Sequence, residues 1–159
     1  PDGEAALVAA VGRIVGSART VADLFAGSGT FALPLSRSAR VEAADGAGPA
    51  IRALDAAARR AGRPVTVQHR DLFRKPLTAQ ELAPFDAVVI DPPRAGAIAQ
   101  TEQIAASKVP VVAAVSCNPA TFARDAERLV AGGYTLQRVW PVAQFRWSTH
   151  VELVAHFAR

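Results

Sequence analysis

The clearest sign of the fold class is the stretch Val21-Ala22-Asp23-Leu24-Phe25-Ala26-Gly27-Ser28-Gly29-Thr30. Its first half is a short apolar run, typical of a buried strand, and its second half is a loop containing two glycines. A helix is predicted directly afterwards, over residues 30–38. A buried strand that leads through such a loop into a helix is the repeating unit of an α/β fold, in which helices cover a mostly parallel sheet.

The same alternation continues on both sides of this stretch. Strands are predicted over residues 21–25, 41–45, 65–69, 85–90, 109–115, 135–142 and 150–158. Helices are predicted over residues 5–16, 30–38, 49–61, 98–107 and 119–131. The last two strands have no helix between them, so they should pair as an antiparallel hairpin at one edge. The predicted fold is therefore α/β: a doubly wound, mostly parallel seven-stranded sheet with a C-terminal antiparallel hairpin.

Composition narrows the class of protein. The chain has 159 residues, 50% of them hydrophobic and 20% charged, which is ordinary for one globular domain. No apolar run approaches the roughly 20 residues of a membrane span, and residues 1–4 lack the features of a signal peptide. The single cysteine cannot form an internal disulfide and has no metal-cluster spacing, so we expect a reducing cytoplasm and no bound metal.

The charge balance favours a nucleic-acid partner. The net charge is +4, the isoelectric point is about 10.2, and arginines far outnumber lysines. The arginines are scattered and form no basic run, so an arginine-rich source proteome explains the same composition equally well. The sequence contains no indication of the oligomeric state.

The chain's one cysteine, Cys117, lies in the run Ser116-Cys117-Asn118-Pro119-Ala120-Thr121-Phe122-Ala123-Arg124-Asp125. The apolar residues 111–115 precede this run, and Pro119 stops the strand that they form. The thiol should therefore lie at the carboxyl end of a strand, where ligands bind in open α/β sheets. Without further motifs, a lone cysteine is more often a small buried apolar residue than a nucleophile.

Two further loops indicate a cofactor. Gly27-x-Gly29 lets a backbone pass close to a ligand, but the dinucleotide fingerprint needs a third glycine where this chain has Ala32. Asp45, at the end of the second strand, could accept both hydroxyls of a ribose. Together they favour an adenosine-bearing cofactor. The rigid Asp91-Pro92-Pro93-Arg94 loop looks like the fourth motif of nucleic-acid methyltransferases that use S-adenosylmethionine.

With these motifs the chain resembles the uracil-C5 RNA methyltransferases, which form 5-methyluridine in tRNA and ribosomal RNA. The matching stretches are residues 23–31, 91–96, 116–125 and 150–154, in family order. The resemblance implies a class I, Rossmann-like fold, S-adenosylmethionine as cofactor, and RNA as substrate in tRNA or rRNA processing. It also implies that residues 1–159 are a catalytic domain, the carboxyl-terminal part of a longer protein. The family's upstream glutamine-containing cofactor motif and its RNA-binding domain have no counterpart in the chain.

The resemblance also assigns roles to individual residues. It makes Cys117 the nucleophile and Glu152 the general base. It implies cofactor contacts from Phe25, Gly27, Gly29, Thr30, Asp45, Asp71 and Asp91. It implies substrate contacts from Asp91, Arg94, Asn118 and Pro119. Asp45 departs from the glutamate that the family more often has, which shortens the reach to the ribose.

The pairing of Cys117 with Glu152 also follows from topology. The final strand should run antiparallel to the strand that ends at Cys117, so its beginning lies at the same edge of the sheet. Glu152 is near that beginning, on the same face as His150. Without Cys117, a single glutamate there would be read as part of a solvated face.

This pair of residues suits chemistry at uracil C5. A thiolate that adds to C6 makes C5 nucleophilic, and a carboxylate must later remove the C5 proton. The base must be flipped out or single-stranded to enter the pocket. The Phe145–Trp147 loop should lie beside this site, where its aromatic rings could stack on an unpaired base or only cover the core.

Other functions remain open on the sequence alone. A methyltransferase that acts on an exocyclic amine needs no cysteine and usually has an aromatic residue in place of Arg94. A cofactor-binding RNA module without activity is a second alternative. An NAD-binding dehydrogenase domain is disfavoured because the third glycine is missing.

Overall fold

The protein is described here by a computed structural model that covers residues 2–143 and 151–159. The helices are α1 Asp2–Val15, α2 Ala32–Leu35, α3 Gly48–Ala61, α4 Ala79–Leu82, α5 Ile98–Ala106 and α6 Pro119–Ala131. The strands are β1 Thr20–Leu24, β2 Arg40–Asp45, β3 Val65–His69, β4 Ala87–Ile90, β5 Val111–Ser116, β6 Thr135–Ala143 and β7 Val151–Ala158.

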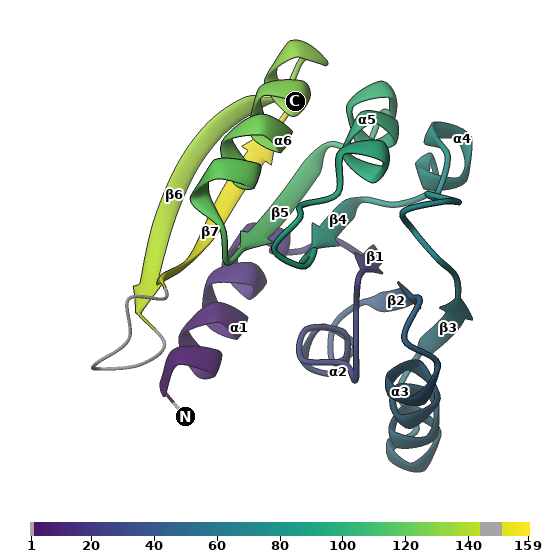
Figure 1. The fold of residues 1–159 in the computed structure, drawn as a ribbon. Coiled ribbons are helices and arrows are strands. Elements are labelled where there is room, and N and C mark those ends of the chain that lie inside the picture. Colours follow the sequence, from purple (N-terminus) through teal and green to yellow (C-terminus); the bar gives the residue numbers. More distant parts are fainter. Residues whose placement is uncertain (1, 144–150) are drawn as a thin grey trace.

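The strands form one seven-stranded sheet in the order β3-β2-β1-β4-β5-β7-β6 (Figure 1). The first five strands pair in parallel, while β7 runs antiparallel to both β5 and β6. The predicted doubly wound sheet with a terminal antiparallel hairpin is therefore confirmed. Within the hairpin, β6 is the edge strand, and β7 lies between β5 and β6.

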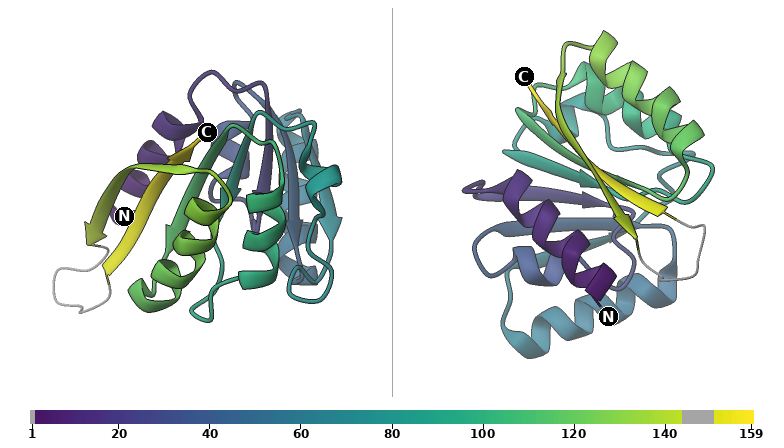
Figure 2. Two further views of the ribbon diagram at one scale, coloured as in Figure 1. Left: turned by 90° about the horizontal axis from the view of Figure 1, so that it is seen from above. Right: turned by 90° about the vertical axis from the view of Figure 1, so that its left-hand side faces the viewer.

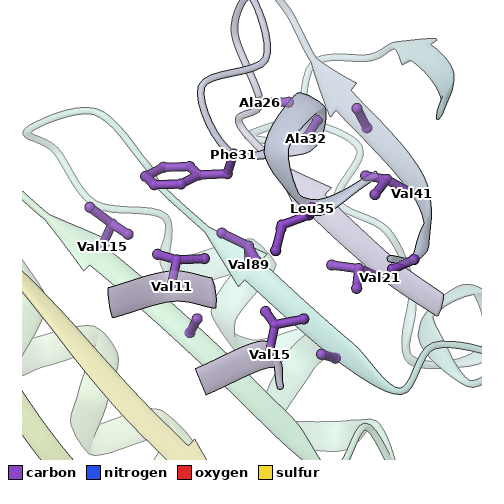
Figure 3. Close-up of a cluster of buried hydrophobic side chains, with 14 of the residues drawn as sticks. Val11, Val15, Val21, Ala26, Phe31, Ala32, Leu35, Val41, Val89 and Val115 are labelled. Atoms are coloured by element: carbon purple, nitrogen blue, oxygen red, sulfur yellow. The ribbon is translucent and has the colours of Figure 1, made fainter. Parts of the chain in front are cut away.

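Helices cover both faces of the sheet (Figure 2). One apolar cluster joins α1, α2 and α3 to the sheet, and Figure 3 shows part of it, with Val11 and Val15 of α1 near Val89 of β4. A second cluster, which includes Ile104 and Leu129, joins α4, α5 and α6 to the opposite face. All four residues of β4 are buried, as expected for a central parallel strand that is covered on both sides.

Two helices differ from the sequence expectation. The helix predicted over 30–38 is only the single turn α2, because Pro34 removes a backbone donor and the Ser36 hydroxyl donates to the Leu33 carbonyl. Helix α4 was not predicted because it has only four residues, too few for a periodic pattern. Its capping box, formed by Thr78 and Glu81, is the sequence signal that could have revealed it.

The predicted Phe145–Trp147 loop and His150 lie outside the described residues. None of the described helices is long and apolar enough to cross a membrane.

Candidate active site

The candidate site lies at the edge of the sheet where parallel strands end. The residues that end or directly follow β1, β2, β4 and β5 are Phe25, Asp45, Asp91 and Cys117. Because carboxyl ends of parallel strands meet at one edge, the fold brings these side chains to one side of the molecule. The hairpin adds Glu152 to this edge, since β7 begins there.

The strand register places Cys117 and Glu152 opposite each other. The last pair in the β5–β7 ladder is Ser116 with Leu153, so Cys117 and Glu152 are the next positions on the two strands. Within β7, Glu152 lies two residues before Val154 and therefore points to the same face of the sheet, that of the cluster with α1. Cys117 is a free cysteine and is only partly buried.

An open pocket of about 590 Å³ lies at the same edge of the sheet. Its volume lies within the roughly 300–1,000 Å³ of small-molecule sites. The pocket is lined by Phe25, Asp45, Gly46, Ala47, Asp71, Leu72, Phe73, Asp91, Pro92 and Pro93. Three of the predicted cofactor residues, Gly27, Gly29 and Thr30, are not among its lining residues.

Asp45 is held by the loop that the glycines form. Its carboxylate accepts the N–H of Gly27 at 2.8 Å and the N–H of Ala47 at 2.7 Å, one at each oxygen. Each carboxylate oxygen can accept a further hydrogen bond, so Asp45 retains capacity for ligand hydroxyls. Gly27 has a φ of 57°. Among the described residues, Phe25 is the one non-glycine residue with a positive φ, 62°. Such strain clusters at ligand sites.

Phe73 is a pocket residue that the sequence analysis missed. Its ring centroid lies 5.3 Å from that of Phe25, at an interplanar angle of 56°. Half of its surface is exposed, which is unusual for a phenylalanine unless a ligand or partner covers it. The two rings form an apolar wall where a planar ligand group could stack. Its position two residues after the predicted contact Asp71 is the sequence signal that could have identified it.

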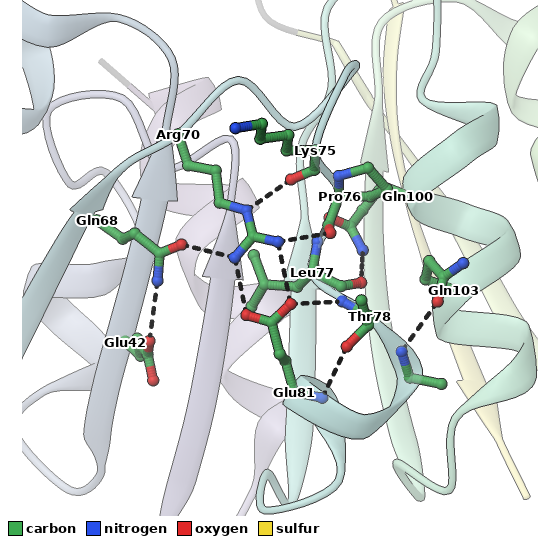
Figure 4. A network of polar contacts seen from close by, with 11 residues as sticks. Glu42, Gln68, Arg70, Lys75, Pro76, Leu77, Thr78, Glu81, Gln100 and Gln103 are labelled. Atoms are coloured by element: carbon green, nitrogen blue, oxygen red, sulfur yellow. Dashed lines mark hydrogen bonds and ion pairs between the residues drawn. The ribbon is translucent and has the colours of Figure 1, made fainter.

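Asp71 lies in a loop that a polar network holds in place (Figure 4). The guanidinium of Arg70 forms a two-pronged ion pair with Glu81 and also donates to the carbonyls of Lys75 and Pro76. The pair with Arg70 lowers the pKa of Glu81 to about 2. The Asp71 carboxylate itself accepts the N–H of Phe73 at 3.0 Å. The network therefore fixes the chain on both sides of the pocket wall.

A buried acid, Asp23, lies within electrostatic reach of the pocket residues Asp45 and Asp91. Asp23 is fully buried on β1, and neither of its side-chain oxygens has a hydrogen-bond partner of good geometry among the described residues. Burial raises its pKa well above the usual value, Asp91 and Asp45 add to this, and the Ala32 amide offsets only part of it. A buried, unpaired acid is costly, and a positively charged ligand group nearby would relieve that cost. Asp23 lies in the middle of an apolar strand, and the sequence pattern alone predicts no role for it.

Asp91 and Glu152 are electrostatically linked. Burial raises the pKa of Asp91 to about 7, and the nearby carboxylates of Glu152 and Asp45 contribute to the shift. Burial also raises the pKa of Glu152. Clefts that hold carboxyl groups with such shifts are candidate functional sites. Asp91 thus lines the pocket and is also close enough to Glu152 for their charges to interact.

The remaining predicted substrate residues lie near the start of α6. Asn118 caps this helix by accepting the N–H of Ala120, and its amide donates to the Arg94 carbonyl at 3.0 Å. Pro119 and the Arg94 side chain are exposed. No group of three or more His, Cys, Asp or Glu residues in the described parts of the chain could hold a metal ion.

Comparisons with known proteins give this site a context. An uncharacterized RNA methyltransferase of Rhizobium meliloti is 58% identical over 143 residues, which cover 89% of this chain and 34% of the relative. The 23S rRNA (uracil(1939)-C(5))-methyltransferase of Chromohalobacter salexigens is 42% identical, covering 83% of this chain and 28% of that protein. These matches span well under two thirds of each relative.

A solved structure agrees with the fold. The crystal structure of Pyrococcus abyssi tRNA (uracil-54, C5)-methyltransferase in complex with S-adenosyl-L-homocysteine matches with a TM-score of 0.85 and 29% identity. The match covers 98% of this chain and 38% of that one. This likeness, together with the sheet order, defines the class: a Rossmann-like α/β methyltransferase domain. The profile of the tRNA (Uracil-5-)-methyltransferase family matches residues 65–159, more than half of the chain. The chain therefore belongs to this family.

Proposed function

We propose that this chain is the catalytic part of an enzyme that transfers a methyl group from S-adenosylmethionine to C5 of a uridine in tRNA or ribosomal RNA. The observation that carries the proposal is the β5–β7 register: its last pair is Ser116 with Leu153, so Cys117 and Glu152 directly continue it, at the sheet edge that also holds a ligand-sized pocket. A nucleophile and a carboxylate on neighbouring strands are the pair that this reaction needs.

The residues of the pocket fit the proposed cofactor. S-adenosylmethionine carries an ammonium and a sulfonium group, and the unpaired carboxylate of Asp23 with the nearby Asp91 suits positive charge. Asp45 has acceptor capacity left for the ribose hydroxyls, and the Phe25–Phe73 wall suits the flat adenine ring. When bound, this cofactor supplies an electrophilic methyl group.

The chain's own residues perform the other steps. Cys117, deprotonated to the thiolate, bonds through its sulfur to C6 of the uracil ring, and the C5–C6 π electrons move toward the C4 carbonyl oxygen as an enolate. C5 thereby becomes nucleophilic and accepts the methyl group. Glu152 then takes the C5 proton, and the electrons of that C–H bond restore the double bond as the sulfur leaves as thiolate. The raised pKa of Glu152 makes its carboxylate a stronger base for this step.

The RNA must present an accessible base to this edge of the sheet. A uridine inside a duplex would have to be flipped out before its C6 reached the thiol. Relatives named for tRNA and for ribosomal RNA both occur, so we propose RNA as the substrate class without preferring either kind. The chain spans 34% and 40% of the length of two of the curated relatives that it matches, which supports the proposal that it is one part of a longer protein.

The test uses the full-length protein with RNA from a strain that lacks it, and mass spectrometry locates the methyl group. Cys117→Ala should abolish methylation at uracil C5 and any covalent protein–RNA species. Glu152→Gln should stall after methyl transfer and accumulate a covalent adduct that survives denaturing electrophoresis. A Cys117→Ala protein that still methylates C5, or a methyl group on an exocyclic amine, would overturn the proposal.

A further inference from the structure

Side chains of α6 and of its N-cap form hydrogen bonds with the loop that follows β4. The Asn118 amide and the Thr121 hydroxyl both donate to the Arg94 carbonyl, at 3.0 and 2.9 Å. The Arg124 guanidinium donates to the Ala95 carbonyl at 3.0 Å, and the Asp125 carboxylate accepts the Ala97 N–H at 2.9 Å. We call these four side chains the α6 clasp: Asn118, Thr121, Arg124 and Asp125.

The clasp recognises backbone rather than side chains. All of its partners in the loop are main-chain groups, so it fixes the path of the loop itself. Gly96, with φ +73°, lets the loop come this close, because a Cβ there would lie 2.7 Å from the Arg124 guanidinium and 2.8 Å from the Asp125 carboxylate. Asp125 is buried and also binds the Arg124 guanidinium, so the clasp is internally braced.

The clasp joins the two parts of the candidate site. The loop that it grips begins with Asp91, Pro92 and Pro93, which form one wall of the ligand pocket. The helix that carries it begins two residues after Cys117, and the Ser116 hydroxyl ties the intervening turn to Asn118 at 3.0 and 3.1 Å. The pocket wall and the thiol are thus connected by directed hydrogen bonds.

We propose that the α6 clasp is a positioning device, which fixes the spacing between the Cys117 thiol and the pocket wall at Asp91–Pro93. This inference rests on the proposed function and adds to it Thr121, Arg124 and Asp125, residues to which the family resemblance gives no cofactor or substrate contact. The thiol and the methyl donor must reach C6 and C5, adjacent atoms of one ring. A misplacement of about 1 Å can cost on the order of 100-fold in rate, so a rigid connection has a purpose here.

The clasp can be tested without methyl transfer because Cys117 is the chain's sole thiol. We expect S-adenosylhomocysteine to slow alkylation of Cys117 by iodoacetamide, measured by mass spectrometry, because ordering the pocket wall orders the thiol turn. Thr121→Val keeps the shape but removes the hydroxyl, and should lose most of this protection while retaining cofactor affinity. Thr121→Ser restores the hydroxyl and should restore the protection.

Tyr134→Phe is the matched control. It also removes a hydroxyl that donates to a backbone carbonyl, that of Val109 at 2.6 Å, which lies just before β5, at the opposite end of that strand from Cys117. In Tyr134→Phe, S-adenosylhomocysteine should still protect Cys117 fully against alkylation, even if this variant lowers the melting temperature as much as Thr121→Val does. In the full-length protein, Thr121→Val should lower the single-turnover rate about tenfold, with Thr121→Ser and Tyr134→Phe near the parent.

Two results would overturn the clasp proposal. One is undiminished protection of the thiol in Thr121→Val, which would mean that the ligand acts on Cys117 directly or not through this contact. The other is a loss of thiol protection in Tyr134→Phe equal to that in Thr121→Val, which would mean that the effect comes from lower overall stability. Failure of the proposed function would appear elsewhere, as C5 methylation that survives Cys117→Ala.

Discussion

Replacing Asp91 by asparagine should stabilise the folded chain while weakening its pocket. Burial, with help from Glu152 and Asp45, raises the pKa of Asp91 from 3.8 to about 7. An acid whose pKa is higher in the folded than in the unfolded chain makes stability fall as pH rises between those values. At one pKa unit per 1.36 kcal/mol, the upper limit of this loss is about 4 kcal/mol above neutral pH. Because the pocket is open to solvent, we expect about 2 kcal/mol.

The measurement is urea denaturation of the parent chain and Asp91→Asn, followed by far-UV circular dichroism across the acid-to-neutral range. The two proteins should have similar stability near the lower pKa, and the variant should gain as pH rises toward about 7, with no further change beyond. Glu102→Gln removes the same charge from an exposed position on α5 and should follow the parent. If Asp91→Asn parallels the parent at every pH, the carboxyl group is not penalised by burial, and the argument fails. The gain in stability of Asp91→Asn should be accompanied by weaker cofactor binding, because stabilising changes at functional sites commonly reduce function.

Three further predictions concern the pocket and its supports. Asp45→Ala should weaken S-adenosylhomocysteine binding in calorimetry by about 1–3 kcal/mol, and equal affinity would remove Asp45 from the cofactor site. Gly29→Ala should lower the melting temperature far more than Gly62→Ala: both have positive φ, but only at Gly29 would the new Cβ lie 2.5 Å from the Leu54 side chain. Glu81→Gln should cost about 1 kcal/mol near neutral pH, since Glu81 is 43% exposed. The depressed pKa of Glu81 means that this difference should narrow as pH falls from 4.5 toward about 2, and a constant difference in denaturation midpoints would contradict the ion-pair account.

The sequence by itself determined the architecture. Apolar runs separated by helical stretches define the strands, and the missing helix between the last two strands requires an antiparallel hairpin. These are local signals, because each depends on residues that are close in the chain. The predicted topology adds one long-range relation to these local signals. Because the final strand is antiparallel to β5, it brings Glu152 to the edge of the sheet where Cys117 lies. Short elements escaped this reasoning, since α4 has a capping box but no period.

Only the tertiary structure decided which residues of the site contact one another and how they ionise. The orphaned carboxylate of Asp23, the raised pKa of Asp91 and the ring of Phe73 beside Phe25 all depend on neighbours from other strands and loops. The α6 clasp is of the same kind, because its hydrogen bonds join residues 24 to 29 positions apart. The burial of a side chain and its interaction with other charges depend on all of its neighbours in space. A pattern along the chain does not specify those neighbours, so it cannot predict the pKa shifts. The sequence could therefore bring the reactive residues to one edge, but only packing could set their ionisation and spacing.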